Sequence, residues 1–196
     1  MVKLKLLKEA LENALVVRRG RYDYFINPLQ GVSPPLRPEL LREVALGFVR
    51  TVDLDVDFIV GMEAMGIHLA AILSQFTGIP AVIVRKKRFD LPGEVEARIE
   101  KSYRRAVGVE EEKFCINSLK KGDKVLIVDD VLSSGGSLAA VIKSLERIGV
   151  IVKDVAVVIR RGDEGSERVK KETGHEIKAL SNIKVEDGKV KILGIL

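Results

Sequence analysis

The amino-acid sequence predicts an α/β fold, a mainly parallel five-stranded sheet with helices on both faces. The first observation is a set of short runs rich in valine and isoleucine, which lie at residues 56–60, 79–84, 124–128, 155–159 and 176–180. All but the last are apolar on both faces, as expected of strands buried on both faces of a parallel sheet. The second observation is that helical patterns, at residues 66–76 and 136–149, separate some of these runs. Strands that alternate with helices indicate crossover connections within one sheet.

Length and composition are those of one globular domain. The chain has 196 residues, of which 46% are hydrophobic and 31% charged, so we expect a single domain over residues 1–196. No apolar run approaches the roughly 20 residues of a membrane span, and Cys115 has no second cysteine for a disulfide. We therefore expect a cytoplasmic protein that does not enter a membrane. The net charge of +5 is modest for this length, which does not favour nucleic acid as a partner.

The segment before the first predicted strand divides into a helix, a loop and a second helix. Leu4, Leu7 and Leu11 have charged residues between them, which indicates an amphipathic helix rather than a secretory signal. Residues 21–37 are rich in proline, glycine and aromatic residues, so we expect a structured loop. Apolar residues then recur with helical spacing from Pro38 to residue 52, and proline suits the first turn of a helix.

Two later segments fall outside the alternating pattern. Asp187 and Gly188 lie between alternating residues, which is the signal of a two-residue β-hairpin near the C-terminus. Between the second and third predicted strands, Arg85 begins a connection that runs to about Leu119. Loops of this length are usually functional, and a flexible flap over about residues 86–118 and an antiparallel hairpin both fit it.

The stretch VLIVDDVLSSGGS, residues 125–137, joins a predicted strand to a predicted helix and carries the most specific chemical signal. Asp129 and Asp130 follow the apolar run directly, and buried carboxylates need hydroxyl partners or a cation. Small residues then open the helix, so that backbone amides and the positive helix N-terminus can bind a phosphate. The sequence contains neither GxxxxGK[ST] nor GxGxxG, which disfavours nucleoside triphosphates and dinucleotides.

Other predicted strands also end in polar loops. Ligands of open α/β sheets bind beyond the carboxyl ends of the strands, so we expect these loops to meet. GMEAMG, residues 61–66, has an acidic residue between turn glycines, and RKKR, residues 85–88, supplies cations for a polyanionic ligand. Arg160 and Arg161 could line a pocket or face solvent. His68 and His175 are assigned no role.

Together these segments resemble type I phosphoribosyltransferases. VLIVDDVLSSGGS is similar to the motif with which these enzymes bind phosphoribosyl pyrophosphate (PRPP), and GMEAMG is similar to their pyrophosphate loop. YFINPL, EAMGI, RKKRF, GEVE and VIRRGD look most like archaeal hypoxanthine-guanine enzymes, and the chain is also similar to the adenine type. The resemblance implies a core over about residues 38–180. It also implies a small hood, over about residues 20–37 and 181–196, that includes the C-terminal β-hairpin.

The reaction that the resemblance implies belongs to purine salvage. The 5-phosphoribosyl group of PRPP would pass to a purine base, and pyrophosphate would be released. Mg²⁺ would be the cofactor, held mainly through PRPP, with no protein ligand assigned. The family also implies a homodimer.

Residue roles follow from the same resemblance. The catalytic pair, which holds the ribose hydroxyls, would be Asp129 and Asp130. The 5-phosphate would be bound by Ser133, Ser134, Gly135, Gly136 and Ser137. The pyrophosphate would be bound by Glu63, Ala64, Arg85 and Lys86. The base would be contacted by Tyr24 and Phe25.

Three departures from the family leave the base open. Ser133 stands where mammalian-type hypoxanthine-guanine enzymes carry an acidic residue, and Tyr24 stands near an arginine position of adenine-type enzymes. The adenine-type Glu-Tyr pair of the flap has only Glu100 and Tyr103 as loose counterparts. The resemblance favours hypoxanthine and guanine, giving IMP and GMP. The alternatives are an adenine enzyme giving AMP, transfer to orotate or another pyrimidine, and a PRPP-sensing transcriptional regulator of the same fold.

Overall fold

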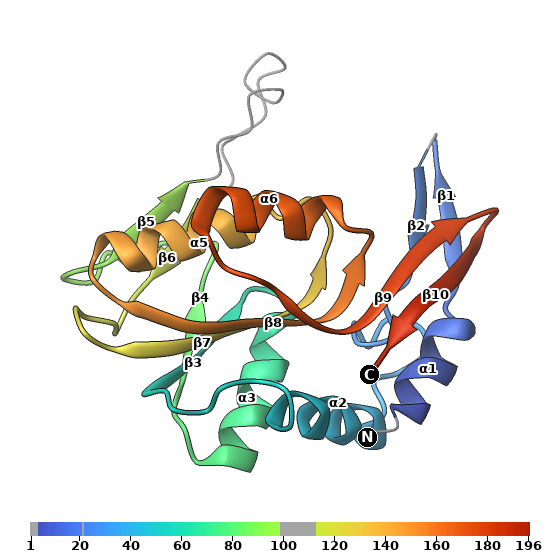
Figure 1. Ribbon diagram of the computed structural model, residues 1–196, viewed down its shortest axis with the longest axis horizontal. Helices are drawn as coiled ribbons and strands as arrows, with labels where there is room; N and C mark the ends of the chain where they lie inside the picture. The colour runs from blue at the N-terminus through green and yellow to red at the C-terminus, as the bar shows by residue number, and fades with distance from the viewer. Residues whose placement is uncertain (1–3, 21, 99–112) are drawn as a thin grey trace.

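A six-stranded sheet with helices on both faces forms the centre of the computed structural model, which describes residues 4–20, 22–98 and 113–196 (Figure 1). The strand order is β10-β9-β8-β7-β3-β4. In that order the strands span Lys189–Ile195, Lys178–Glu186, Ile151–Arg161, Lys124–Leu132, Phe58–Met62 and Ala81–Val84. β4, β3, β7, β8 and β9 run parallel, and β10 is antiparallel to β9. The predicted set of five parallel strands is confirmed, since each overlaps one predicted apolar run.

Two groups of helices cover the sheet. On one face lie α5 (Gly136–Arg147) and α6 (Glu164–Thr173), and on the other lie α2 (Pro38–Val49) and α3 (Gly66–Thr77) (Figure 1). α1 (Lys5–Glu12) packs beside β10. Helix α6 was not predicted, because its buried residues are only Gly165 and Val169 and its apolar stripe is therefore too thin to show in the sequence. Within the described residues, no helix combines the length and the apolar character that crossing a membrane requires.

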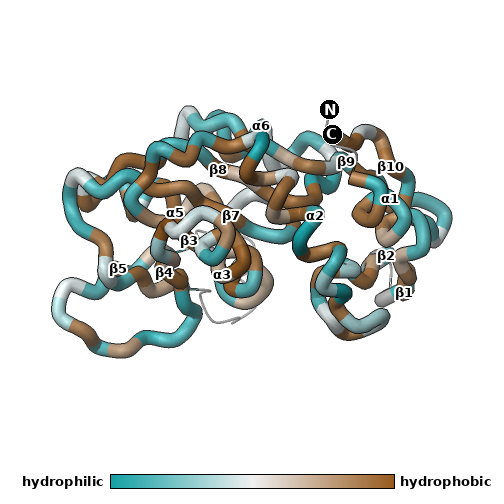
Figure 2. Tube along the Cα trace, turned by 90° about the horizontal axis from the view of Figure 1, so that it is seen from below, coloured by the Kyte–Doolittle hydropathy of each residue, from teal (hydrophilic) through white to brown (hydrophobic). Residues whose placement is uncertain are grey.

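Buried strand residues alternate between two hydrophobic clusters. Val125 and Ile127 of β7 pack with α5, whereas Leu126 and Val128 pack with α2 and α3. This placement on both faces explains why residues 125–128 are all apolar. Figure 2 shows the hydrophobic segments gathered in the strands and most helices, with hydrophilic segments mainly in the connecting loops. The loops at the strand ends are therefore where polar chemistry is available.

Antiparallel pairs lie around this core. β1 (Val16–Arg19) pairs with β2 (Tyr22–Phe25), and β5 (Val95–Arg98) pairs with β6 (Lys113–Ile116). In the β9–β10 hairpin, the turn residues Asp187 and Gly188 have φ of 52° and 69°, the left-handed conformation that an Asp-Gly turn supplies.

The two shorter hairpins bear on two sequence expectations. Strand β2 lies where a loop was expected from residue 21, because four residues are too few to show a period. β5 and β6 give the base of the long connection an antiparallel hairpin, one of the two predicted alternatives. Glu100 and Tyr103 lie outside the described residues.

The strand order changes direction between β3 and β7. The chain passes from β3 to β4 on one side and later places β7 on the other, and ligand sites of open α/β sheets lie at such points. β3 pairs with β7 only as far as Gly61 and Val128, whereas β7 continues beside β8 to Leu132. Asp129 and Asp130 therefore lie within β7 rather than after it, at the step where β3 ends.

Candidate active site

The adjacent carboxylates of β7 occupy the step in the sheet. Asp129 Oδ1 accepts a hydrogen bond from the backbone N of Asp130 at 2.9 Å. Both residues are partly buried, and desolvation raises the pKa of Asp130 and, further, that of Asp129. The neighbouring carboxylate of Asp130 adds to the raised pKa of Asp129, while Lys86 opposes it. Carboxylates that have lost part of their hydration are good acceptors for the hydroxyl groups of a ligand.

Asn27, in the loop after β2, contacts this pair from the predicted hood. Its Nδ2 donates to Asp130 Oδ2 at 2.6 Å, and its Oδ1 accepts from the backbone N of Leu29 at 3.0 Å. The residue is only 2% exposed. An asparagine in a loop ordinarily indicates a turn, so no sequence pattern pointed to this contact with the acidic pair.

His68, in the first turn of α3, also lies near Asp130. Burial lowers the pKa of its imidazole, and the charge of Asp130 opposes this effect. Among the described residues, none makes a hydrogen bond to its buried Nε2 atom. A histidine to which the sequence assigned no role therefore lies beside the predicted ribose site.

The small residues between β7 and α5 form a tight turn. Gly135 has φ of 71° and precedes Gly136, the first residue of α5. A Cβ on Gly135 would collide with the carbonyl oxygen of Gly165 in α6, so both its φ and its packing require glycine. Ser133 and Ser134 are exposed, and Ser137 is partly buried. Exposed hydroxyls thus lie at the positive N-terminus of α5, an arrangement that suits a phosphate.

Arg168 of α6 places a cation beside this turn. A Cβ on Gly136 would lie 2.9 Å from Arg168 Nη1, and Arg168 Nε donates to Glu172 Oε1 at 2.7 Å. Sequence reasoning missed this arginine, because α6 itself was not predicted and charged helix residues are most often solvated.

The loop after β3 packs closely against the start of α3. A Cβ on Gly61 would lie 2.5 Å from the carbonyl oxygen of Gly66, and a Cβ on Gly66 would lie 3.3 Å from Asp129 Oδ1. The peptide bond between Glu63 and Ala64 is cis. The absence of side chains on the two glycines is what brings this loop next to the acidic pair.

Glu63 reaches from this loop to the basic end of β4. Its Oε2 accepts a hydrogen bond from the backbone N of Lys86 at 2.7 Å and lies 3.3 Å from Arg85 Nε in an ion pair. Arg85 is also joined to Cys115 at the edge of β6 by backbone hydrogen bonds of 2.9 and 2.6 Å. The structure therefore brings together the four residues predicted for pyrophosphate, and the charge of Lys86 acts on Asp129.

Arg88 serves the turn into β5 instead. It pairs with two carboxylates of that turn, Asp90 Oδ1 at 2.6 Å and Glu94 Oε1 at 3.4 Å, and with Glu96 Oε1 of β5 at 3.4 Å. The basic run RKKR is therefore divided between two surroundings, and its role toward a polyanion stays a prediction. Its first two residues lie beside Glu63, and its last one stabilises a loop.

Tyr24 and Phe25, predicted to contact a base, differ in their surroundings. Phe25 is 5% exposed and packs in the hydrophobic cluster of α1 and α2, whereas the Tyr24 hydroxyl accepts a hydrogen bond from Gln30 Nε2 at 3.0 Å. Arg161 Nη2 donates to the carbonyl oxygen of Asp23 at 3.2 Å. Arg161 thus joins the end of β8 to the hood, and the roles of Tyr24 and Phe25 in base binding stay predictions.

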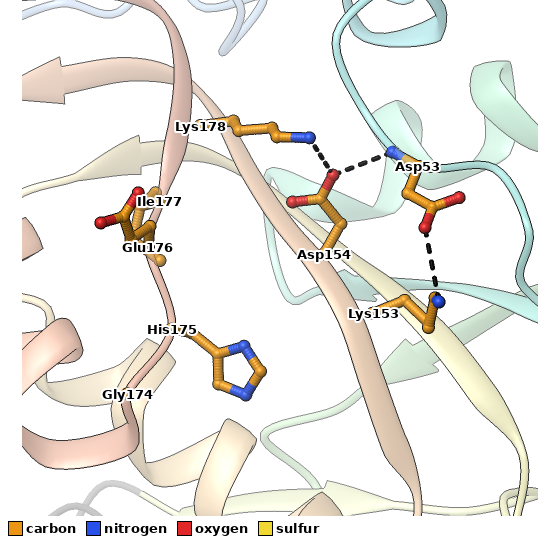
Figure 3. Close-up of a pocket in the computed structure, with 8 residues that line it drawn as sticks. All are labelled: Asp53, Lys153, Asp154, Gly174, His175, Glu176, Ile177 and Lys178. Carbon is orange, nitrogen blue, oxygen red and sulfur yellow. Dashed lines mark hydrogen bonds and ion pairs between the residues drawn. The ribbon is translucent and has the colours of Figure 1, made fainter.

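A separate pocket lies at the opposite, amino-terminal edge of the sheet. It has a volume of about 430 Å³ and is lined by Asp53, Lys153, Asp154, Gly174, His175, Glu176, Ile177 and Lys178 (Figure 3). Asp154 Oδ2 accepts hydrogen bonds from Lys178 Nζ at 2.6 Å and from the backbone N of Asp53 at 2.9 Å. Because these charges are paired with one another, the candidate active site remains at the other edge of the sheet, where the carboxyl ends of the parallel strands lie.

A metal site built from protein side chains is not part of the described structure. Over residues 4–20, 22–98 and 113–196, no three His, Cys, Asp or Glu side chains are placed to hold a metal ion together. The two carboxylates of β7 fall short of such a set. A divalent cation here would need oxygens supplied by a ligand.

The arrangement suits an elongated ligand with an anionic group at each end. The turn before α5 offers hydroxyls and a helix N-terminus. Arg85 and Lys86 offer cations just beyond the carboxyl end of β4. Between them lie the carboxylates of β7, which accept hydroxyl donors. A sugar phosphate with a second phosphate group combines these features.

Comparison with known proteins agrees with this geometry. Residues 36–188 match the family model described as phosphoribosyl transferase domain. The hypoxanthine/guanine phosphoribosyltransferase of Methanocella paludicola is 46% identical over 193 residues, which covers 98% of this chain and 97% of the relative. The enzyme of the same name from Methanothermobacter thermautotrophicus is 46% identical over 186 residues, covering 95% and 93% of the two chains.

Solved structures share the fold at lower identity. Adenine phosphoribosyltransferase from Rhodothermus marinus superposes with a TM-score of 0.71 at 24% identity, covering 93% of this chain and 98% of its own. The adenine enzyme of Leishmania tarentolae gives a TM-score of 0.72 at 21% identity, covering 94% and 89%. At this identity the likeness concerns the fold alone.

Proposed function

Because the chain belongs to the phosphoribosyl transferase domain family, we propose that it is a purine phosphoribosyltransferase of purine salvage. It transfers the 5-phosphoribosyl group of PRPP to hypoxanthine or guanine, giving IMP or GMP and pyrophosphate. The observation that carries the proposal is the acidic pair of β7, which lies between a phosphate turn and a basic strand end. The preference for 6-oxopurines rests on relatives named hypoxanthine/guanine phosphoribosyltransferase, which are 46% identical to this chain.

The phosphate turn and the acidic pair bind the sugar phosphate. Ser133 to Ser137 hold the 5-phosphate through hydroxyls and the N-terminus of α5. Asp129 and Asp130 accept hydrogen bonds from the 2- and 3-hydroxyls of the ribose. These contacts fix C1 of the sugar relative to the base.

The basic strand end serves the leaving group. The bond between C1 and the pyrophosphate oxygen breaks, a purine nitrogen forms the new bond to C1, and the purine gives up a proton to solvent. Charge grows on pyrophosphate as this happens, and Arg85 and Lys86 neutralise it. Alignment of two bound reactants is worth at most about 7–11 kcal/mol of the barrier. The protein therefore needs no nucleophile of its own.

Mg²⁺ is the proposed cofactor, and it enters with PRPP. When bound, it would neutralise phosphate oxygens of the substrate and leaving group. No side chain of this chain is assigned to it, because the described residues build no metal cluster. The cytoplasmic location and the homodimer are likewise proposals, supported by the resemblance to the family.

A parallel assay of bases tests the function. The purified chain is supplied with PRPP and Mg²⁺ and with hypoxanthine, guanine, xanthine, adenine or orotate, and the nucleotide products are separated and measured. We expect IMP and GMP to form with kcat/KM at least 100-fold above the value for adenine, since a site that hydrogen-bonds the 6-oxo group rejects a base without it. AMP as the main product would replace the proposal by the adenine enzyme. Orotidine monophosphate as the main product would indicate a pyrimidine enzyme.

A further inference from the structure

Asn27 has both ends of its amide committed. The Oδ1 atom accepts from the backbone N of Leu29 at 3.0 Å, so the NH₂ group must be the end that meets Asp130 Oδ2 at 2.6 Å. The residue is 2% exposed, which leaves its side chain little freedom to turn elsewhere. The bond spans 103 positions of the sequence and ties the predicted hood to β7.

We propose that Asn27 is a positioning residue that holds the Asp130 carboxylate, ionised and oriented, for the ribose of PRPP. The inference rests on the proposed function, because it takes Asp130 as a ribose ligand. A donor that faces one carboxylate oxygen fixes the rotation of the group about its χ2 bond. It also favours the charged form, which is the form that accepts two hydroxyl donors.

The other groups around Asp130 explain why such a donor is needed. Desolvation is the largest effect on Asp130 and raises its pKa, while the backbone N–H of Val131, the Asn27 amide and the Asp129 side chain lower it by hydrogen bonding. The charge of Asp130 in turn raises the pKa of Asp129. His68, from α3, is held neutral because burial lowers the pKa of its ring, so it does not serve as a counter-cation at neutral pH. The charge of Lys86, which follows β4, lowers the pKa of Asp129 rather than that of Asp130. Asn27 contributes a side-chain donor that needs no charge of its own.

Its place in the chain gives Asn27 a second consequence. It lies two residues from Phe25 and three from Tyr24, in the segment predicted to cover the base. A movement of this loop on base binding would move the donor at Asp130. With Tyr24 and Phe25 as the predicted base contacts, this hydrogen bond would join the base site to the ribose site.

The test uses Asn27→Asp and Asn27→Ala in the full chain. Asn27→Asp keeps the shape and the acceptor for Leu29 N but removes the donor, and Asn27→Ala removes both. Gln30→Ala is the matched control, because it removes an amide donor to Tyr24 from the same loop without touching Asp130. Circular dichroism and thermal melting establish that each variant folds.

Two readouts separate positioning from a structural role. The first is the pH dependence of kcat/KM for PRPP with hypoxanthine, and the second is the pKa of Asp130 from a ¹³C carboxyl NMR titration. We expect both the acid limb and the pKa of Asp130 to rise by about one pH unit in Asn27→Ala. Asn27→Asp should raise both further, because it adds a like charge. In Gln30→Ala both should match the wild type.

The outcomes are distinct. Folded Asn27 variants with an unchanged Asp130 pKa and acid limb would overturn the inference, whatever their kcat. A wild-type chain that forms no nucleotide from PRPP would instead overturn the proposed function. The NMR titration would still decide in that case whether Asn27 sets the ionisation of Asp130.

Discussion

Glu63 and Arg85 form an ion pair at the carboxyl ends of β3 and β4, with 3.3 Å between Oε2 and Nε. The same oxygen accepts the backbone N of Lys86 at 2.7 Å. A carboxylate thus occupies the donors that are proposed to bind pyrophosphate. Glu63, which the resemblance assigned to the pyrophosphate site, would therefore compete with pyrophosphate for these donors, since both are anions.

Replacing this carboxylate should tighten pyrophosphate binding. We predict that Glu63→Gln lowers the inhibition constant of pyrophosphate about three- to tenfold, because a partly exposed pair competes by only about 1 kcal/mol. Steady-state product inhibition at fixed PRPP measures it. Glu96→Gln, which removes a partner of Arg88 in the neighbouring turn, is the control and should leave the constant unchanged. Weaker inhibition in Glu63→Gln would show that the carboxylate assists pyrophosphate instead.

Asp129 should lower the free energy of unfolding at high pH, although activity requires it. The folded-state pKa of Asp129 is raised, so folding favours its protonated form, and that contribution is lost as pH rises from the unfolded pKa through the folded one. We predict that Asp129→Asn, which cannot ionise, raises the free energy of unfolding at pH 8 by on the order of 1 kcal/mol. The gain should shrink toward pH 4, while activity falls at least tenfold. Urea unfolding at both pH values measures the free energy of unfolding. An equal gain at pH 8 and pH 4 would contradict ionisation of Asp129 as its cause.

Gly135 should tolerate no side chain. Its φ of 71° disfavours a side chain, and an added Cβ would lie 2.4 Å from the carbonyl oxygen of Gly165. We predict that Gly135→Ala costs about 2–4 kcal/mol of stability, and that a folded remainder binds PRPP poorly. Gly174→Ala is the matched control, because φ is 79° there but nothing lies within 4 Å of the added Cβ. It should cost only about 1 kcal/mol, and equal losses in the two variants would refute the packing argument.

Removal of divalent cations should affect activity and stability differently. We predict that a chelator reduces nucleotide formation by more than 100-fold and that added Mg²⁺ restores it. The melting temperature of the free protein should not change, because the described residues hold no metal cluster. Full activity in excess chelator would contradict the proposed cofactor, and a chelator-dependent melting temperature would indicate a protein-bound metal.

The sheet could be predicted because its strands are buried on both faces. Runs such as residues 125–128 are apolar throughout, and the pattern predicts them together with the loop that follows them. Short or polar elements were not recognised, as β2 and α6 illustrate, because four residues show no period and two buried positions make no stripe. Asp129 and Asp130 were expected in the loop directly after the strand, whereas they lie within the strand itself. β7 continues past Val128 because β8 pairs with it after β3 has ended.

The site could be predicted where adjacent residues carry it, and not where distant segments meet. The phosphate turn and the acidic pair lie within one stretch of sequence. The contact of Asn27 with Asp130 joins residues 103 positions apart, and the position of Arg168 beside Gly136 depends on the packing of α6 on α5. Within RKKR, Arg85 pairs with Glu63 and Arg88 pairs with Asp90. This difference depends on side-chain directions, which no pattern of charges encodes.

The central claim is that the carboxyl edge of this sheet binds PRPP and turns it over. The most direct measurement is the stoichiometric formation of IMP and pyrophosphate from PRPP and hypoxanthine, by the wild type and by folded Asp130→Asn side by side. We predict equimolar products from the wild type and turnover at least 100-fold lower in the variant. Equal turnover by Asp130→Asn, or no IMP from the wild type, would contradict the account.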